Sequence, residues 1–95
     1  MSEYRIDIRD AVLHYLRNEF SGFDIQEEPD NESYCFRLSK QPDTHFLRVL
    51  YSATQSCDAG GIGTLLEQYA VAGTMRNLGE FPVVVTEQGC MFGSP

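Results

Sequence analysis

Hydrophobic and polar positions change their spacing several times along the chain, and each spacing predicts a different element. Over residues 3–20 the apolar side chains recur every three to four positions, which is typical of one buried helical face. We expect Ser2 or Asp7 to cap the start of this helix. Gly22 should end it in the left-handed conformation that glycine adopts readily.

Three shorter segments predict strands. Apolar and polar side chains alternate over Phe23–Glu27 and again over Tyr34–Ser39. The third segment, His45–Tyr51, is apolar on both faces apart from Arg48. Turn-forming residues separate the three segments, so we expect an antiparallel meander.

Helical spacing returns over Thr64–Leu78, where Gly79 is the expected C-terminal cap, and a last strand follows over Phe81–Thr86. The run Val83–Val85 is apolar on both sides, which favours an interior position in the sheet. Residues 87–95 are expected to form a loose tail. The order predicts one small α+β domain over residues 1–95, αβββαβ, with both helices packed on one face of the sheet.

The net negative charge of the chain limits the kinds of partner that it can bind. The chain has 95 residues, of which 14 are acidic and 7 basic, with a formal net charge of -7. Nucleic-acid binding and attraction to anionic membranes both depend on a basic surface, so we expect neither nucleic acid nor a membrane as partner. A protein partner with a basic or neutral surface fits better, and self-association is also compatible.

Cysteine and histidine usage gives no sign of a catalytic or metal centre. The three cysteines are Cys35, Cys57 and Cys90, and neither His14 nor His45 stands at ligand spacing from them. An odd number of cysteines and a charged N-terminus indicate a reducing, cytoplasmic environment. We expect small core thiols with one exposed, and we predict no metal, no cofactor and no enzymatic activity.

A glycine-rich stretch, SCDAGGIGT at residues 56–64, precedes the second predicted helix. Free N–H groups at a helix start can hold an anion, so a candidate ligand or anion site comprises Asp58, Gly60, Gly61, Gly63 and Thr64. The stretch lacks the lysine of GxxxxGK[ST], and Leu66 replaces the third glycine of GxGxxG. The alternative is a plain connection with left-handed backbone, in which Asp58 or Thr64 lies near the helix cap.

The predicted turn between the first two strands is acidic. Its spacing does not match a calcium-binding EF-hand loop, so a solvated charged turn is the expected structure. Such a turn would attract a basic partner. The candidate partner-facing residues are Glu27, Glu28, Asp30 and Glu32, and Asp24 lies close to them in sequence.

The element order resembles that of two known families. With Pro29-Asp30 and Leu38-Ser39-Lys40, the chain resembles the core of PD-(D/E)xK nucleases, which implies that Asp30 would bind a metal ion. Leu38 stands where that family has its second acid, so the resemblance implies an inactive relative. The first five elements also resemble the double-stranded RNA-binding domain, but the expected basic residues are missing from Gly63–Glu67.

Together these observations predict a small, non-enzymatic domain that works through protein contacts, with an open edge strand available for pairing. A ligand or anion sensor that uses the glycine-rich stretch is the alternative. An inactive relative of the nucleases is the third hypothesis.

Overall fold

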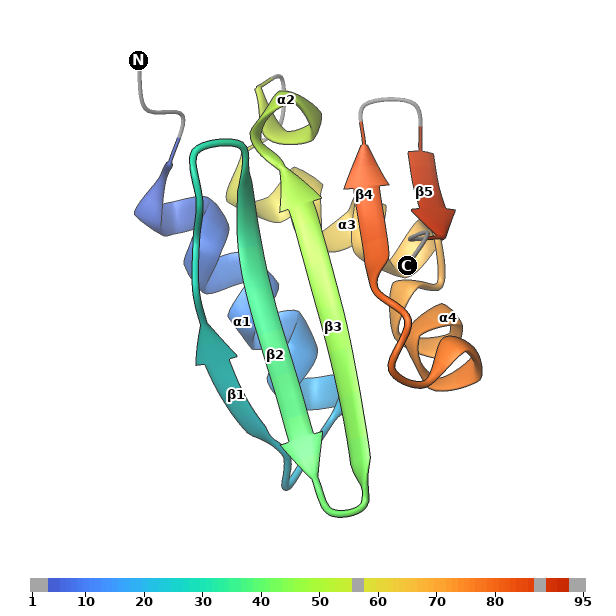
Figure 1. The fold of residues 1–95 in the computed structure, drawn as a ribbon. Coiled ribbons are helices and arrows are strands. Elements are labelled where there is room, and N and C mark those ends of the chain that lie inside the picture. The colour runs from blue at the N-terminus through green and yellow to red at the C-terminus, as the bar shows by residue number, and fades with distance from the viewer. Residues whose placement is uncertain (1–3, 56–57, 87–88, 93–95) are drawn as a thin grey trace.

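The computed structural model describes residues 4–55, 58–86 and 89–92 and confirms a small α+β domain (Figure 1). The elements are α1 (Ile6–Glu19), β1 (Asp24–Glu27), β2 (Ser33–Lys40), β3 (Asp43–Leu50), α2 (Tyr51–Thr54), α3 (Ala59–Gln68), α4 (Val71–Leu78), β4 (Val83–Thr86) and β5 (Gly89–Phe92).

The strands form one mixed sheet in the order β1-β2-β3-β4-β5. The predicted meander is confirmed, because β1, β2 and β3 pair antiparallel in sequence order. The helical segment after β3 carries the chain back to the level at which β3 begins, so β4 runs parallel to β3. The interior position predicted for Val83–Val85 is also confirmed, since β4 lies between β3 and β5.

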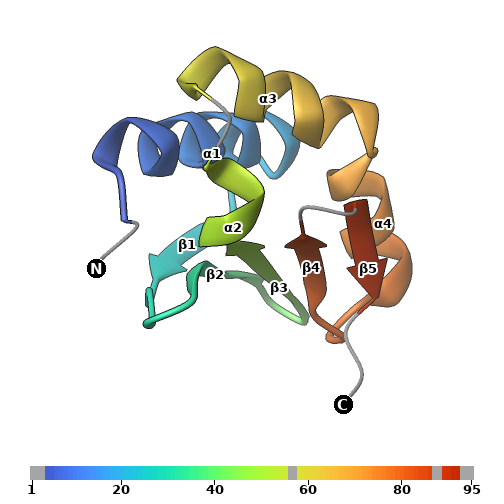
Figure 2. The same cartoon turned by 90° about the horizontal axis from the view of Figure 1, so that it is seen from above.

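The long helices lie on one side of the sheet, as expected. Seen from above, α1 and α3 lie side by side on one side of the strands, and α4 stands at the β4–β5 end of the sheet, where it contacts β3 and β4 (Figure 2). The core fills the space between these helices and the inner sheet face. Its fully buried large side chains include Ile8, Val12, Leu16, Tyr34, Phe36, Leu38, Leu47, Val49, Ile62, Leu66, Val71 and Met75.

The limits of α1 differ from the prediction. The N-cap position belongs to Arg5, whose side chain makes no capping hydrogen bond, and Asp7 lies inside the first turn. The prediction of Asp7 as the cap is therefore wrong, and Ser2 lies outside the described residues. Asp7 instead pairs with the Arg5 guanidinium, with 2.9 Å between Oδ2 and Nη2. Gly22 has a φ of 86°, which confirms its left-handed conformation.

The second predicted helix is two helices, α3 and α4, separated at Ala70, which has a left-handed φ of 50°. Both helices are apolar at helical spacing, so the sequence pattern continues across the break. The change of direction lets α3 pack on α1 while α4 contacts β3 and β4. Gly79 ends α4 with a φ of 62°, which confirms the predicted C-terminal cap.

The predicted loose tail is wrong for Gly89–Phe92, which form β5 and pair antiparallel with β4. Backbone pairing explains this strand, because the outer edge of β4 offers N–H and C=O groups that a short following segment can satisfy. The rest of the predicted tail lies outside the described residues.

Candidate interaction surface

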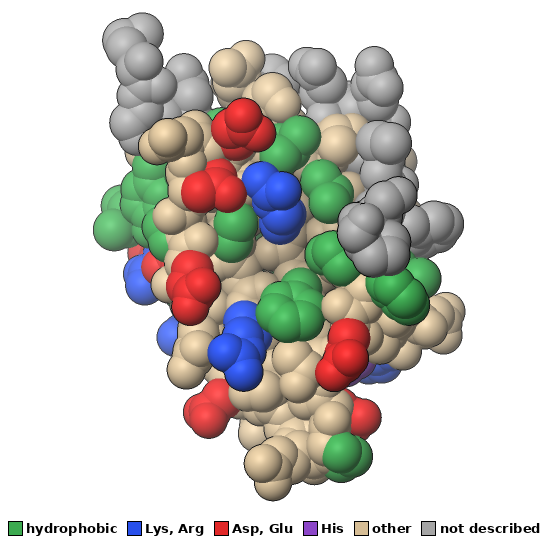
Figure 3. Space-filling model, in the orientation of Figure 1, with side chains coloured by type: hydrophobic (Ala, Val, Ile, Leu, Met, Phe, Trp, Pro, Cys, Tyr) green, Lys and Arg blue, Asp and Glu red, His purple; other side chains and the backbone are tan. Residues whose placement is uncertain are grey.

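The sheet face opposite the helices carries the surface of interest, here called the open sheet face. Strand side chains alternate, so one set from β2, β3 and β4 enters the core and the other points away from the helices. The outward set includes Cys35, Arg37, Phe46, Arg48 and Val84. Figure 3 shows hydrophobic side chains gathered over these strands, with basic side chains beside them and acidic ones around.

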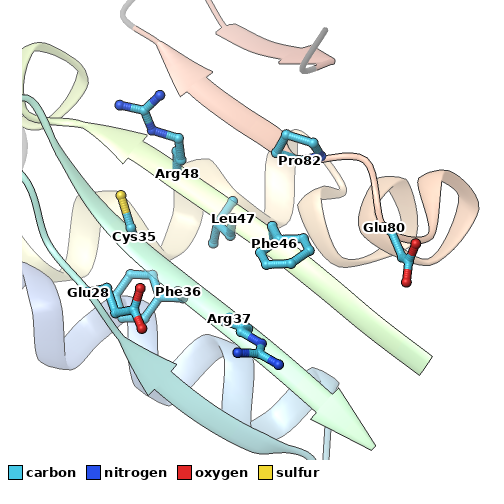
Figure 4. Close-up of a pocket in the computed structure, with 9 residues that line it drawn as sticks. All are labelled: Glu28, Cys35, Phe36, Arg37, Phe46, Leu47, Arg48, Glu80 and Pro82. Atoms are coloured by element: carbon cyan, nitrogen blue, oxygen red, sulfur yellow. The ribbon is translucent and has the colours of Figure 1, made fainter. Parts of the chain in front are cut away.

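A shallow hollow of about 370 Å³ lies on this face (Figure 4). Register explains how it forms: Arg37 is paired with Phe46, and Cys35 with Arg48, across β2 and β3. The Phe46 ring lies at the centre of the view and is only partly exposed. The residues lining the hollow are Glu28, Cys35, Phe36, Arg37, Phe46, Leu47, Arg48, Glu80 and Pro82.

Some charged side chains on the open sheet face are paired within the fold, and others are not. The Arg48 guanidinium donates to Asp30 Oδ2 at 3.2 Å and to the buried Ser33 hydroxyl at 3.1 Å. The side chains of Arg37, Glu28 and Glu80 form no ion pair with any described residue. Three charges around one partly apolar hollow are therefore available to a binding partner.

The acidic turn proves to be partly structural. Asp30 Oδ1 accepts hydrogen bonds from the backbone N–H groups of Glu32 and Ser33 at 2.8 and 2.9 Å. These bonds, together with the Ser33 hydroxyl and the Arg48 charge, hold the pKa of Asp30 below its ordinary value. Asp30 thus shapes the β1–β2 turn.

Glu27 is also engaged within the fold. Its carboxylate accepts hydrogen bonds from the Tyr4 hydroxyl and from Arg9 Nε, both at 3.0 Å, and points toward the helical side. Its side chain is 18% exposed. Of the four predicted partner-facing acids, Glu28 and Glu32 are exposed without an ion pair among the described residues, and Asp24 is exposed on β1.

The glycine-rich stretch is helical from Ala59 onward, so the expectation of a left-handed loop is wrong. Asp58 is the N-cap, as the alternative interpretation expected, and its carboxylate accepts from the Gly61 N–H at 2.6 Å. The Asp58 carboxylate therefore occupies the place that an anion would take. The tertiary structure brings Gly60, Gly63 and Thr64 to a groove of about 420 Å³ against α1.

That groove offers little to a ligand. The Thr64 hydroxyl donates to the Gly60 carbonyl oxygen at 3.2 Å, and the side chains of His14 and Asn18 are bonded to each other. Thr64, His14 and Asn18 therefore each have a hydrogen-bond partner within their own helix. The sequence-predicted ligand residues are thus mostly adjacent, but their arrangement is that of a capped helix packed on α1.

The structure keeps the remaining candidate groups apart. His45 is buried and packs against the rings of Phe20 and Phe23, and its Nδ1 lies 3.1 Å from the Gly79 carbonyl oxygen. Cys35 is half-buried on the open sheet face, whereas Cys57 and the Cys90 side chain lie outside the described residues. Among the residues described, no group of three or more His, Cys, Asp or Glu side chains could hold a metal ion.

The nuclease resemblance does not extend to a metal site. Asp30 precedes the first residue of β2 and Lys40 is its last, so they lie about 20 Å apart along the strand. Leu38 is fully buried in the core, where an acid would be costly. The residues that the resemblance would bring together are therefore separated by the length of β2.

Sequence reasoning did not single out the hollow. The signal was present in His45–Tyr51, a segment apolar on both faces, because the helices can cover only one of them. Which side of β3 stays open depends on where α1 and α3 pack, and no local pattern specifies that.

Within the described ranges, no helix has both the length and the apolar character needed to cross a membrane. Comparisons with protein-family models, curated proteins and solved structures found no match to this chain.

Proposed function

We propose that this chain is a protein-interaction domain that binds its partner on the open sheet face. One observation carries the proposal: the described helices cover one face of the sheet, while the other presents Phe46, Pro82 and Val84 partly exposed around a hollow. In a two-layer α+β domain the second face of the sheet normally meets solvent and is polar, so partly exposed apolar side chains gathered there mark an interaction site. A partner would bury these apolar side chains.

The composition of the hollow suits protein recognition. Aromatic residues and arginine are both enriched in protein interfaces relative to the rest of the surface. Here Phe46 provides apolar area and the neighbouring Arg37 provides a cation that forms no ion pair with the described residues. Glu28 and Glu80 stand at the rim, where charges govern orientation and the rate of encounter.

Strand addition at an edge is less well supported than binding on the face. The sheet ends at β1 on one side and β5 on the other, and each has four residues. Short edge strands offer few backbone hydrogen bonds to an incoming chain. The face over β2, β3 and β4 is broader and carries the aromatic and charged groups.

The test is capture of partners from a native lysate with the tagged chain, at low and moderate salt, comparing Phe46→Ser with Ile6→Ser. Ile6 is a matched control, because it is a large hydrophobic residue that is 65% exposed at the start of α1. We expect a bound protein to be lost with Phe46→Ser and kept with Ile6→Ser.

Circular dichroism of each variant establishes that the fold is retained. If Phe46→Ser unfolds the chain, Arg37→Glu serves in its place, since Arg37 is exposed and outside the core. Binding that survives both substitutions on the open sheet face would contradict the proposal.

A further inference from the structure

We infer that the partner on the open sheet face is a second copy of this chain, bound face to face about a two-fold axis close to Phe46. The inference rests on the proposed function and names the partner. It follows from the order of charges on either side of the Phe46 ring.

Three groups lie in a row across the open sheet face. Arg37 on β2 is paired in register with Phe46 on β3, and Glu80 lies on the other side of the ring, just before β4 (Figure 4). Neither Arg37 nor Glu80 has an ion-pair partner among the described residues. The row therefore reads cation, aromatic ring, anion.

This order selects among partners. A strongly acidic partner would meet Glu28 and Glu80 on the same face, and a strongly basic one would meet Arg37 and Arg48. Like charges brought together in an interface cost free energy and suppress wrong partners. The matching partner carries both signs in the reverse order across an aromatic centre.

A second copy meets that requirement by symmetry. In a two-fold interface the same patch appears on both subunits, so residue i contacts j and j contacts i. An axis near Phe46 that runs along the strands, perpendicular to this row, places Arg37 of each copy opposite Glu80 of the other, and it brings the two Phe46 rings together. Two aromatic rings in contact add to the apolar area that becomes buried.

The overall charge favours this face over the rest of the surface. Two copies with a formal net charge of -7 repel each other, and the repulsion acts within about 8 Å at physiological salt. Arg37 and Arg48 are two of only 7 basic residues, and both lie on the open sheet face. Approach through this face therefore costs less than approach through the acidic remainder.

The size of the face sets the expected strength. β2 and β3 have eight residues and are about 26 Å long, whereas β1 and β4 have four and are about 13 Å long; at about 4.8 Å of width per strand, the flat area is on the order of 400 Å². Stable interfaces bury about 800 Å² from each partner, so this face supplies about half of that area, as weak and transient interfaces do. We expect a reversible dimer with a micromolar dissociation constant.

The experiment is sedimentation equilibrium of the full chain from low micromolar to near-millimolar concentration, with two charge reversals. Arg37→Glu leaves two anions flanking Phe46, and Glu80→Arg leaves two cations, so each variant alone should dimerise about tenfold more weakly or worse. An equimolar mixture of the two variants should restore a dimer, because each acid of one chain then faces a base of the other.

Controls separate this effect from a change in net charge. Arg17→Glu on α1 and Glu67→Arg on α3 make the same two reversals at exposed positions on the helical side. Both should dimerise as the original chain does, and circular dichroism should show an unchanged fold for all four variants.

A chain that stays monomeric across the whole range would overturn the inference. So would variants Arg37→Glu and Glu80→Arg that dimerise like their controls, or a mixture that fails to restore association. The proposed function is tested separately from the dimer. If the chain is monomeric but a captured protein is lost with Phe46→Ser, the inference of a dimer fails and the proposed function is still supported.

Discussion

Tyr15 should stabilise the fold through a single hydrogen bond between distant parts of the chain. Helix α4 begins after Ala70 and has no side-chain cap of its own. The Tyr15 hydroxyl on α1 accepts a hydrogen bond from the Ala72 N–H at 3.1 Å, which satisfies one of the free donors at the start of α4. Ala72 is 2% exposed and Tyr15 is 8% exposed, so water cannot readily replace the hydroxyl.

The Tyr15→Phe variant keeps the ring and removes this acceptor. Leaving a buried donor without a partner costs about 1–3 kcal/mol. We expect a loss of about 1–2 kcal/mol in the free energy of unfolding, because removal of the hydroxyl also relieves its own burial. For a domain of this size, that loss corresponds to a fall in Tm of roughly 5–15 °C.

Urea and thermal unfolding measure the effect, and Tyr69→Phe is the matched control. Tyr69 is also packed against the core, but its hydroxyl forms no hydrogen bond with a described residue. We expect the control to change stability by less than about 0.5 kcal/mol. If Tyr15→Phe is no more destabilising than Tyr69→Phe, the hydrogen bond to Ala72 does not support α4 and the reasoning is refuted.

Three further predictions concern backbone and turn geometry. Gly63→Ala should raise stability by about 0.5–1 kcal/mol, because Gly63 is helical and no atom of another part of the chain lies within 4 Å of the added Cβ. Gly22→Ala should lower stability, because Gly22 has a φ of +86°, and thermal unfolding compares the two variants. Asp58→Ala should cost about 1 kcal/mol through loss of the cap to Gly61, with Asp58→Asn as the control that retains an acceptor. The pKa of Asp30 is lowered in the fold, so its contribution to stability is complete above the ordinary pKa of 3.8 and is lost as pH falls through the lower folded value. The difference in Tm between the original chain and Asp30→Asn should therefore shrink on acidification below 3.8. A difference in Tm that does not depend on pH would argue against this account.

Local patterns were sufficient for the first half of the chain. Alternation over β1 and β2 and the polar turns between strands correctly predicted the meander, because side-chain direction repeats every two residues in a strand. The same holds for α1, whose apolar spacing follows the helical repeat. Gly22 and Gly79 were correctly placed at helix ends, since their conformations are ones that other residues rarely adopt.

Local patterns misled where a residue type has two uses. The glycines of residues 60–63 suggested a loop, but the Asp58 cap and the burial of Ile62 and Leu66 hold them in a helix. Burial outweighs the low helix propensity of glycine, which amounts to about 1 kcal/mol per residue. The break at Ala70 was also not predicted, because the apolar residues on both sides of it follow helical spacing.

The sequence by itself determined the class of the fold, its first strands and its acidic charge, because those depend on near neighbours and on composition. Tertiary structure decided the rest. Contacts between distant segments pair β5 with β4, and they leave Phe46 and Arg37 on an uncovered face. Glu27 and Asp30, which were predicted to face a partner, accept hydrogen bonds from Arg9 and Ser33 within the fold. The physical reason is that a strand apolar on both sides does not specify which side the helices will bury; that choice is made by contacts between segments far apart in the chain.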